Sequence, residues 1–229
     1  MNIKIIIPAR YQSSRFPGKP LAEIEGKSLI RRVWERCVLA ASENDVYVAT
    51  DSKEIMEHCR QQNIQALMTS DECLTGTDRV YEASCQLDAD VCINVQGDEL
   101  LISPDDIHKV IEVHRKKPGA VHCGMCPIRT EEDFRKSSVP KVVCRDNGQL
   151  LYMSRAAIPT DKKLAFSKAY KQVCIYAFSK EALSDFAGYG KKATLEQIED
   201  IEILRFLEMG YCVEMVEVSE SSVAVDFPE

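Results

Sequence analysis

The sequence predicts an α/β protein with a doubly wound, mostly parallel sheet and a smaller antiparallel lobe. In the first half of the chain, short runs rich in Ile and Val alternate with amphipathic stretches, which is typical of repeated βαβ units. From about residue 120, two strand-like segments flank Asn147-Gly148, a dipeptide typical of a tight hairpin turn. Because no flexible linker or internal repeat separates the two patterns, we expect one domain over residues 1–229, with the lobe at about residues 120–180.

Length and composition favour a folded protein that handles a small ligand. The chain has 229 residues, of which 45% are hydrophobic, and this is enough to bury a sizeable core. Asp and Glu number 36 against 29 Lys and Arg, so the net charge is −7 and we expect no nucleic-acid partner. Lys4 interrupts the first apolar run, and no later run is long enough to cross a membrane. We therefore expect a cytoplasmic protein without a membrane partner.

The first half predicts four strands, at residues 3–7, 46–49, 64–68 and 91–95. The segments between them have helical periodicity. One helix carries a single apolar stripe made of Leu29, Ile30, Val33, Trp34, Cys37, Val38 and Ala41. Another begins at Ser103-Pro104, because serine is a good N-cap and proline is tolerated at the first helical position.

The second half predicts strands at residues 120–128 and 171–178, and a hairpin formed by residues 139–145 and 150–154. Thr194 and Gln197 have the spacing of a capping box, which predicts one helix from Thr194 to about Met209 that Gly210 ends.

The ten cysteines are scattered through the chain, so we expect reduced thiols and no disulfide framework. Cys123 and Cys126 have the CxxC spacing of metal and redox sites. However, they fall on a predicted strand, where positions three apart point to opposite faces, and no second CxxC is present. We expect them to be small buried hydrophobic residues.

The loop at residues 8–21 follows the first predicted strand and carries Arg10, Arg15 and Lys19. Two forked guanidinium groups and a compact ammonium group suit a polyphosphate, and backbone amides around Ser13 and Ser14 would add donors. The loop lacks the GxxxxGK[ST] pattern of a P-loop. It lies at the carboxyl edge of a parallel sheet, where ligands of such sheets bind, although a solvated basic loop is the alternative.

Acidic residues follow the fourth predicted strand at the same edge. Asp98 lies in the segment Asn94-Val-Gln96-Gly-Asp98-Glu99, and Asp226 follows a short apolar run near the C-terminus. Because Mg²⁺ prefers one or two carboxylates together with phosphate oxygens, we expect Mg²⁺ at Asp98 and, with less support, at Asp226.

Five segments together resemble CMP-Kdo synthetases, also called 3-deoxy-manno-octulosonate (Kdo) cytidylyltransferases. They are residues 8–21, the Thr-Gly-Thr-Asp-Arg segment at 75–79, residues 94–99, Ser-Arg-Ala-Ala-Ile-Pro at 154–159 and Val-Asp-Phe-Pro-Glu at 225–229. Their order and spacing match that family through essentially the whole chain. Members usually continue into a terminal helix, whereas this chain ends shortly after Asp226.

The resemblance implies a nucleotidyltransferase that joins CTP and a 3-deoxy acid sugar to give a CMP-sugar and pyrophosphate, with Mg²⁺, for lipopolysaccharide or another surface polysaccharide. It also implies a homodimer. The nucleotide-binding residues that it implies are Pro8, Ala9, Arg10, Ser13, Arg15, Lys19, Thr75, Gly76, Thr77, Asp78 and Arg79. The sugar-binding residues that it implies are Gln96, Arg155, Tyr176, Glu199 and Glu202. Arg10, Lys19 and Asp98 would be catalytic, with Asp98 and Asp226 as metal ligands.

Several positions depart from the family pattern, mostly on the sugar side. The departures are Cys73 and Gln172 for histidines, Leu100 for proline, Cys174 for glycine, Phe178 for tyrosine and Ile203 for glutamine. Because polar pairing decides between similar substrates, the sugar is Kdo, its 8-amino analogue or another acid sugar. Two other hypotheses remain open, namely a nucleotidyltransferase for a different coat sugar and a catalytically silent nucleotide-binding protein.

Overall fold

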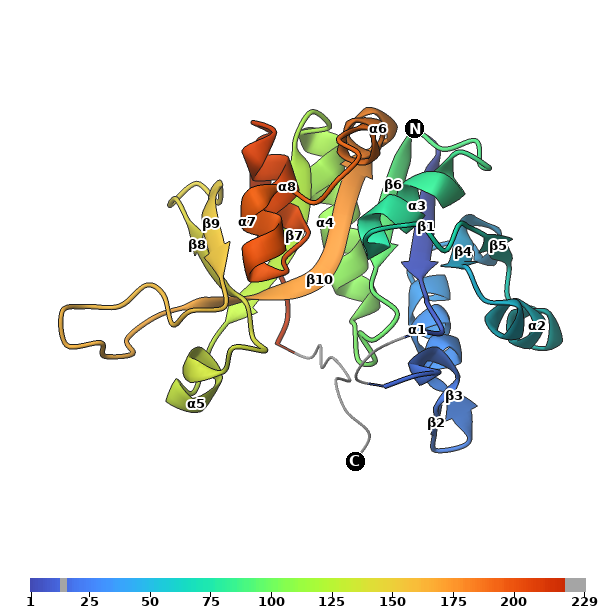
Figure 1. The fold of residues 1–229 in the computed structure, drawn as a ribbon, viewed down its shortest axis with the longest axis horizontal. Coiled ribbons are helices and arrows are strands. Elements are labelled where there is room, and N and C mark those ends of the chain that lie inside the picture. The colour runs from blue at the N-terminus through green and yellow to red at the C-terminus, as the bar shows by residue number, and fades with distance from the viewer. Residues whose placement is uncertain (13–15, 221–229) are drawn as a thin grey trace.

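The computed structural model describes residues 1–12 and 16–220, and in these residues one sheet of nine strands lies between two layers of helices (Figure 1). The main strand order is β11-β7-β10-β6-β1-β4-β5. β1, β4, β5 and β6 are parallel, whereas β10 runs antiparallel to both β6 and β7. β8 and β9 form a hairpin that joins the sheet through β10. The predicted fold class is confirmed.

The strands are β1 Ile3–Pro8, β2 Glu23–Ile24, β3 Lys27–Ser28, β4 Val46–Thr50, β5 Ala66–Met68, β6 Val91–Val95, β7 Val121–Pro127, β8 Lys141–Cys144, β9 Leu150–Ser154, β10 Tyr170–Ser179 and β11 Val213–Glu217. The helices are α1 Leu29–Val38, α2 Lys53–Gln61, α3 Gly76–Ser84, α4 Pro104–Lys116, α5 Glu131–Arg135, α6 Lys180–Gly188, α7 Thr194–Glu199 and α8 Ile203–Glu208, with short 3-10 turns at Lys19–Leu21 and Glu43–Asp45.

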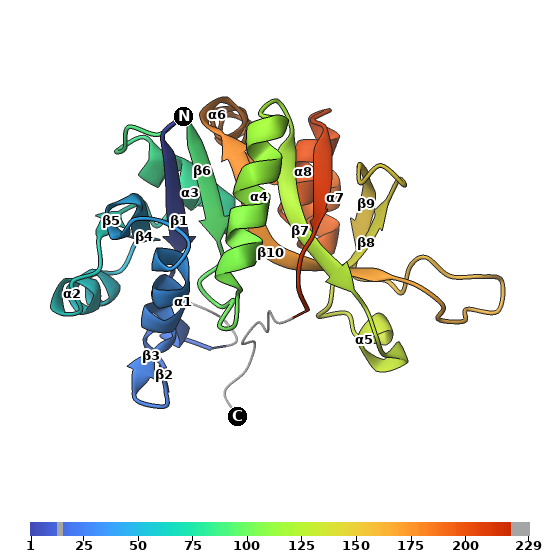
Figure 2. The ribbon, with the colours of Figure 1, turned by 180° about the vertical axis from the view of Figure 1, so that it is seen from behind.

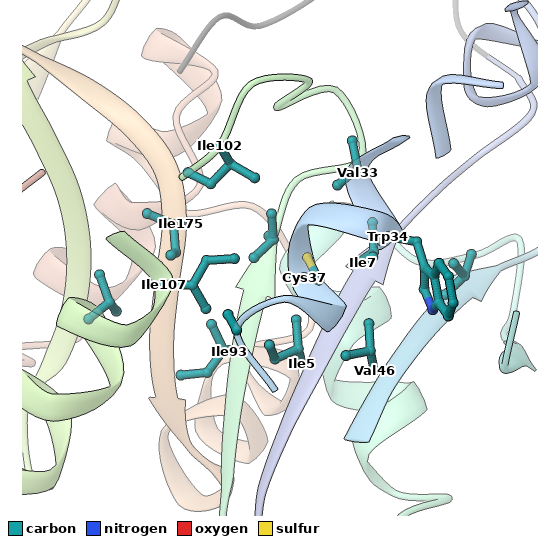
Figure 3. Packing of buried hydrophobic residues seen from close by; sticks show 14 of the residues in the cluster. Ile5, Ile7, Val33, Trp34, Cys37, Val46, Ile93, Ile102, Ile107 and Ile175 are labelled. Atoms are coloured by element: carbon teal, nitrogen blue, oxygen red, sulfur yellow. The ribbon is translucent and has the colours of Figure 1, made fainter. Parts of the chain in front are cut away.

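Alternate residues of the central strands build two cores. Ile5 and Ile7 face α1 and α4, whereas Ile6 faces α3, α6 and α8. Figure 2 shows α1 and α4 on one face, with α3, α7 and α8 behind the sheet. The side chains of the first core interdigitate around Ile5, Ile7, Val33, Cys37, Ile93 and Ile107 (Figure 3). This burial holds the carboxyl ends of β1 and β6 at one edge.

The CxxC pair behaves as its strand position predicts. Cys123 lies in one core and Cys126 in the other, so their thiols face away from each other across β7. All ten cysteines are unpaired. Burial raises the pKa of Cys126 to about 11 and that of Cys123 to about 12, which keeps both as neutral thiols.

The single helix predicted from Thr194 to Met209 is wrong. Two short helices, α7 and α8, are separated at Asp200, whose φ of 50° lies in the left-handed region. The predicted capping box is also displaced, because Ala193 N donates to the Glu196 carboxylate and Gln197 has no part in it. Arg155 stabilises the break by donating to the carbonyl oxygens of Glu199 and Asp200, which the end of α7 leaves without helical partners.

Candidate active site

The described part of the loop after β1 places Arg10 and Lys19 at the carboxyl edge of the sheet. Ala9 N donates to Ala49 O at 2.8 Å, and Gly18 N donates to Tyr11 O at 2.8 Å. Gly18 has a φ of 71°, which favours glycine, and the Tyr11 ring lies against it. Arg10 is exposed in this arrangement. Ser13 and Arg15 lie outside the described residues.

Lys19 and Asp98 meet at this edge. Lys19 Nζ donates to Asp98 Oδ2 at 2.7 Å, and the two side chains are 16% and 32% exposed. The approach depends on Gly97, because a Cβ at that position would lie 2.9 Å from Pro8 O. The structure therefore brings together the basic loop after β1 and the acidic segment after β6.

Asp98 offers hard oxygen ligands that fit Mg²⁺. Its carboxylate is partly exposed next to Lys19, where a triphosphate would supply further oxygens. The neighbouring Glu99 is directed elsewhere, since it is buried and its Oε1 accepts from Cys174 N at 2.9 Å. Asp226 lies outside the described residues, and within residues 1–12 and 16–220 no three His, Cys, Asp or Glu side chains form a metal-binding group.

The segment at 75–79 forms the start of α3. Its N–H and hydroxyl donors at Gly76 and Thr77 already make hydrogen bonds within the protein. Glu202 accepts from Gly76 N at 3.1 Å and from Thr77 N at 2.9 Å, and from Thr77 Oγ1 at 2.6 Å. Burial raises the pKa of Glu202, and the hydrogen bonds from Thr77 and Gly76 oppose this. Thr75 caps the helix by accepting from Asp78 N at 3.2 Å.

Two charged side chains of α3 have structural partners. Arg79 is buried and donates to Asp51 Oδ2 at 2.7 Å. Asp78 accepts from Arg205 Nη1 at 2.9 Å. Contact of these side chains with nucleotide remains a prediction, and in this structure their ion pairs join α3 to α8 and to Asp51, the residue directly after β4.

Arg155 and Glu199 lie together where β9 meets the end of α7. Glu199 accepts from Ser154 Oγ at 2.6 Å, from Arg155 N at 2.9 Å and from Tyr152 Oη at 3.2 Å. Burial raises the pKa of Glu199, but these hydrogen bonds outweigh that effect and the pKa is lowered. The carboxylate is therefore ionised and fixed.

Gln96 and Tyr176 complete the predicted sugar-binding residues. A Cβ at Gly76 would lie 3.0 Å from Gln96 Nε2 and 3.4 Å from Glu202 Oε1, so these side chains adjoin the start of α3. The Tyr176 hydroxyl accepts from Gln172 Nε2 at 2.9 Å, and burial raises the pKa of Tyr176 well above its ordinary value. Gln172 and Cys174, two of the departures from the family pattern, are thus both hydrogen-bond partners of Tyr176.

Sequence reasoning missed the residue that ties the sugar side to α3. Arg205 is fully buried, and its Nε and Nη2 each donate to Glu196 at 2.7 Å while Nη1 bonds Asp78. The sequence carries one signal for this role, which is an arginine among the apolar residues of α8. A charge buried with such residues requires a partner of opposite charge.

Comparison with known proteins agrees with this geometry. Residues 4–217 match the cytidylyltransferase family. The chain belongs to that family. It is 39% identical to a 3-deoxy-manno-octulosonate cytidylyltransferase of Syntrophotalea carbinolica, over 100% of this chain and 95% of the relative. It is 38% identical to an 8-amino-3,8-dideoxy-manno-octulosonate cytidylyltransferase of Shewanella halifaxensis, with the same coverage of 100% and 95%.

A solved structure of this cytidylyltransferase type is closely similar. It is a CMP:2-keto-3-deoxy-manno-octonic acid synthetase complexed with CTP, with a TM-score of 0.91 and 34% identity over 100% of this chain and 94% of the other. This chain therefore shares its overall fold with an enzyme solved with CTP.

Proposed function

We propose that this cytidylyltransferase transfers CMP from CTP to a 3-deoxy acid sugar, either Kdo or its 8-amino analogue, and releases pyrophosphate. The product would supply lipopolysaccharide or another surface polysaccharide. The observation that carries the proposal is the Lys19–Asp98 pair at the carboxyl ends of β1 and β6, with the exposed Arg10 on the same loop as Lys19. It joins a cation for phosphate to a carboxylate for a metal. Full-length relatives named for both sugars support the choice of acceptor.

Arg10 and Lys19 would bind the triphosphate and offset its negative charge, while Asp98 would hold Mg²⁺, with Asp226 as a second ligand. Bound Mg²⁺ supplies further charge neutralisation and polarises the phosphate. We expect the sugar hydroxyl to attack the α-phosphate directly, without a covalent enzyme intermediate, because positioning and charge neutralisation account for most of such catalysis.

Arg155 would bind the carboxylate of the acid sugar through its planar fork. Gln96, Tyr176 and the nearby acids Glu199 and Glu202 would contact or shape the rest of the sugar. The 8-amino analogue is a specific second candidate, because Gln172 stands where the family usually has histidine and bonds the Tyr176 hydroxyl.

We also propose a cytoplasmic homodimer. Ten unpaired cysteines are consistent with a reducing compartment. Leu151 on β9 is 51% exposed and Ile198 on α7 is 73% exposed, and such apolar side chains suit a subunit interface. No helix in the described part of the chain is long and apolar enough to cross a membrane. Light scattering on the purified chain measures the oligomeric state.

The decisive experiment measures pyrophosphate release from CTP and Mg²⁺ with Kdo, its 8-amino analogue and a nine-carbon sialic-type acid, and uses UTP as the nucleotide control. Turnover with Kdo or the 8-amino sugar supports the proposal and shows which one is preferred. Absence of turnover with both refutes it.

A further inference from the structure

Lys141 on β8 is a buried cation to which neither the sequence motifs nor the proposed chemistry assigns a role. Its side chain is fully buried. Its Nζ donates to Lys136 O at 2.7 Å and to Val139 O at 2.6 Å, and the structure shows no ion pair to it among the described residues. Burial and the nearby Arg155 lower the pKa of Lys141, while Glu199 raises it. Burying an ammonium group costs free energy. The burial of Lys141 against two carbonyl oxygens therefore calls for a structural explanation.

The loop that Lys141 binds also holds Arg155. Arg155 Nη1 donates to Ser137 O at 3.0 Å, so two cations bind three carbonyl oxygens between residues 136 and 139. Lys141 pairs with Ser154 between β8 and β9, directly beside Arg155 in the chain. The position of this loop therefore affects where the Arg155 guanidinium lies.

The remaining contacts fix the plane of that guanidinium. Arg155 Nε donates to Glu199 O at 2.5 Å and Nη2 donates to Asp200 O at 2.9 Å. Of the five guanidinium N–H donors, three bind backbone carbonyls, and the Asp200 carboxylate lies 3.7 Å from Nη2 as an ion-pair partner, so one N–H on Nη1 and one on Nη2 make no carbonyl contact. Two parallel donors of this kind match the two oxygens of a carboxylate. Loss of the Ser137 contact would remove one of the three restraints on the fork, the one on Nη1.

We propose that Lys141 is a positioning residue for recognition of the acid-sugar carboxylate. It holds the loop at residues 136–140, and this loop orients Arg155 through Ser137 O. The role rests on the proposed function, in which Arg155 binds the sugar carboxylate. Lys141 itself does not touch substrate, because its ammonium group is buried beneath the loop.

The test compares Lys141→Met with Lys136→Met. Both remove a lysine side chain, but Lys136 is 46% exposed in its side chain, and its substitution keeps the carbonyl that Lys141 binds. We expect Lys141→Met to raise KM for the acid sugar about tenfold or more, with KM for CTP within about twofold, because a misoriented fork loses roughly one charged hydrogen bond. Lys136→Met should change neither constant.

A second comparison separates positioning from general stability. In an Arg155→Ala background, Lys141→Met should add less than about twofold to KM for the sugar, because the two residues act as one unit. A folded Lys141→Met with unchanged KM for the sugar overturns the role. So does an equal rise of KM for both substrates, which a merely structural lysine would cause.

If Lys141→Met does not fold, Lys141→Gln replaces it, because the amide keeps two N–H donors on a side chain one atom shorter. This variant should raise KM for the sugar at least about threefold, and an unchanged value overturns the role. Wild-type chain is assayed first on the same panel of sugars. Its failure on every acid sugar refutes the proposed function and this role with it, whereas failure confined to the Lys141 variants refutes only the positioning.

Discussion

The two halves of the candidate active site hold their charged side chains in opposite ways. On the nucleotide side, Arg10 is exposed, and one ion pair joins Lys19 to Asp98. On the sugar side, Arg155 donates to three backbone carbonyls, and Glu199 accepts three hydrogen bonds. The first set of charges is held by a single side-chain ion pair, whereas the second is held by several hydrogen bonds, most of them to the backbone.

The difference follows from what each half must bind. A triphosphate brings several negative charges and a metal, so Lys19 and Asp98 must exchange their mutual contact for phosphate and metal contacts. A neutral sugar ring with one carboxylate brings little charge, so recognition depends on donors already held in place. Substitutions on the nucleotide side should therefore change turnover with little change in stability, whereas substitution of the buried Arg205 should mainly change stability.

The largest effect is expected for Asp98→Asn. Loss of the metal-binding carboxylate should lower kcat by about 1,000-fold or more, equivalent to roughly 4 kcal/mol. Stability should change by less than about 1 kcal/mol, because a single partly exposed ion pair contributes little. Steady-state kinetics and urea denaturation measure the two quantities. Asp105→Asn, an exposed acid at the start of α4, is the control, and a near-normal kcat for Asp98→Asn would remove the metal-ligand assignment.

Arg205→Met should have the largest effect on stability. The substitution leaves Glu196 and Asp78 without the guanidinium that holds them, and breaking a buried charged network costs about 3–4 kcal/mol. Urea denaturation checks this value. Arg115→Met on α4 is the matched control, since Arg115 is exposed and, among residues 1–12 and 16–220, its one ion pair is with Glu112 at 2.7 Å. If both variants lose the same stability, the sugar side is not held by its buried charges.

The contrast between the halves also explains what could be predicted from sequence. β1, β4 and β6 follow from short apolar runs, and the β8–β9 hairpin follows from Asn147-Gly148. Lys19 and Asp98 could be paired because the carboxyl ends of parallel strands share an edge. The insertion of β10 between β6 and β7 could not be predicted, because strand order depends on contacts between residues far apart in sequence.

Two features of the sugar side had no adequate local signal. The break at Asp200 requires a left-handed residue in a segment whose apolar periodicity continues into α8. The stabilising donors come from Arg155, which lies 45 residues away from Asp200 in the chain. The roles of Lys141 and Arg205 likewise depend on partners that only the tertiary structure brings near.

Arg155→Lys sharpens the comparison with a smaller effect. Lysine keeps the charge but cannot supply a planar fork and three carbonyl contacts at once. We expect KM for the acid sugar to rise about 10- to 100-fold, or roughly 1.4–2.7 kcal/mol, with KM for CTP within about twofold. Lys171→Arg on β10 is a control for a conservative change in the same lobe. An equal rise of KM for CTP would mean that the two halves do not recognise separate substrates.

The smallest effect concerns a buried histidine pair that belongs to neither half. His114 Nδ1 and His122 Nδ1 lie 3.1 Å apart, and in the described part of the chain each Nε2 lacks a hydrogen-bond partner. Burial lowers the pKa of both, that of His122 to about 4, where His114 and Lys117 lower it further and Glu214 opposes them. The unfolded chain therefore binds protons that the folded chain excludes.

This difference fixes the direction of the pH dependence. The stability due to His122 is complete above a pH of about 6.5 and is lost progressively as pH falls toward 4, with about 1–2 kcal/mol lost between pH 7 and 5. Urea denaturation at pH 7, 6 and 5 tests this, with His122→Gln as the comparison, because glutamine does not titrate. The variant should lose less stability on acidification than the wild type. If the wild type and the variant lose the same stability on acidification, the acid sensitivity comes from carboxylates elsewhere. The histidine pair then has no effect on stability.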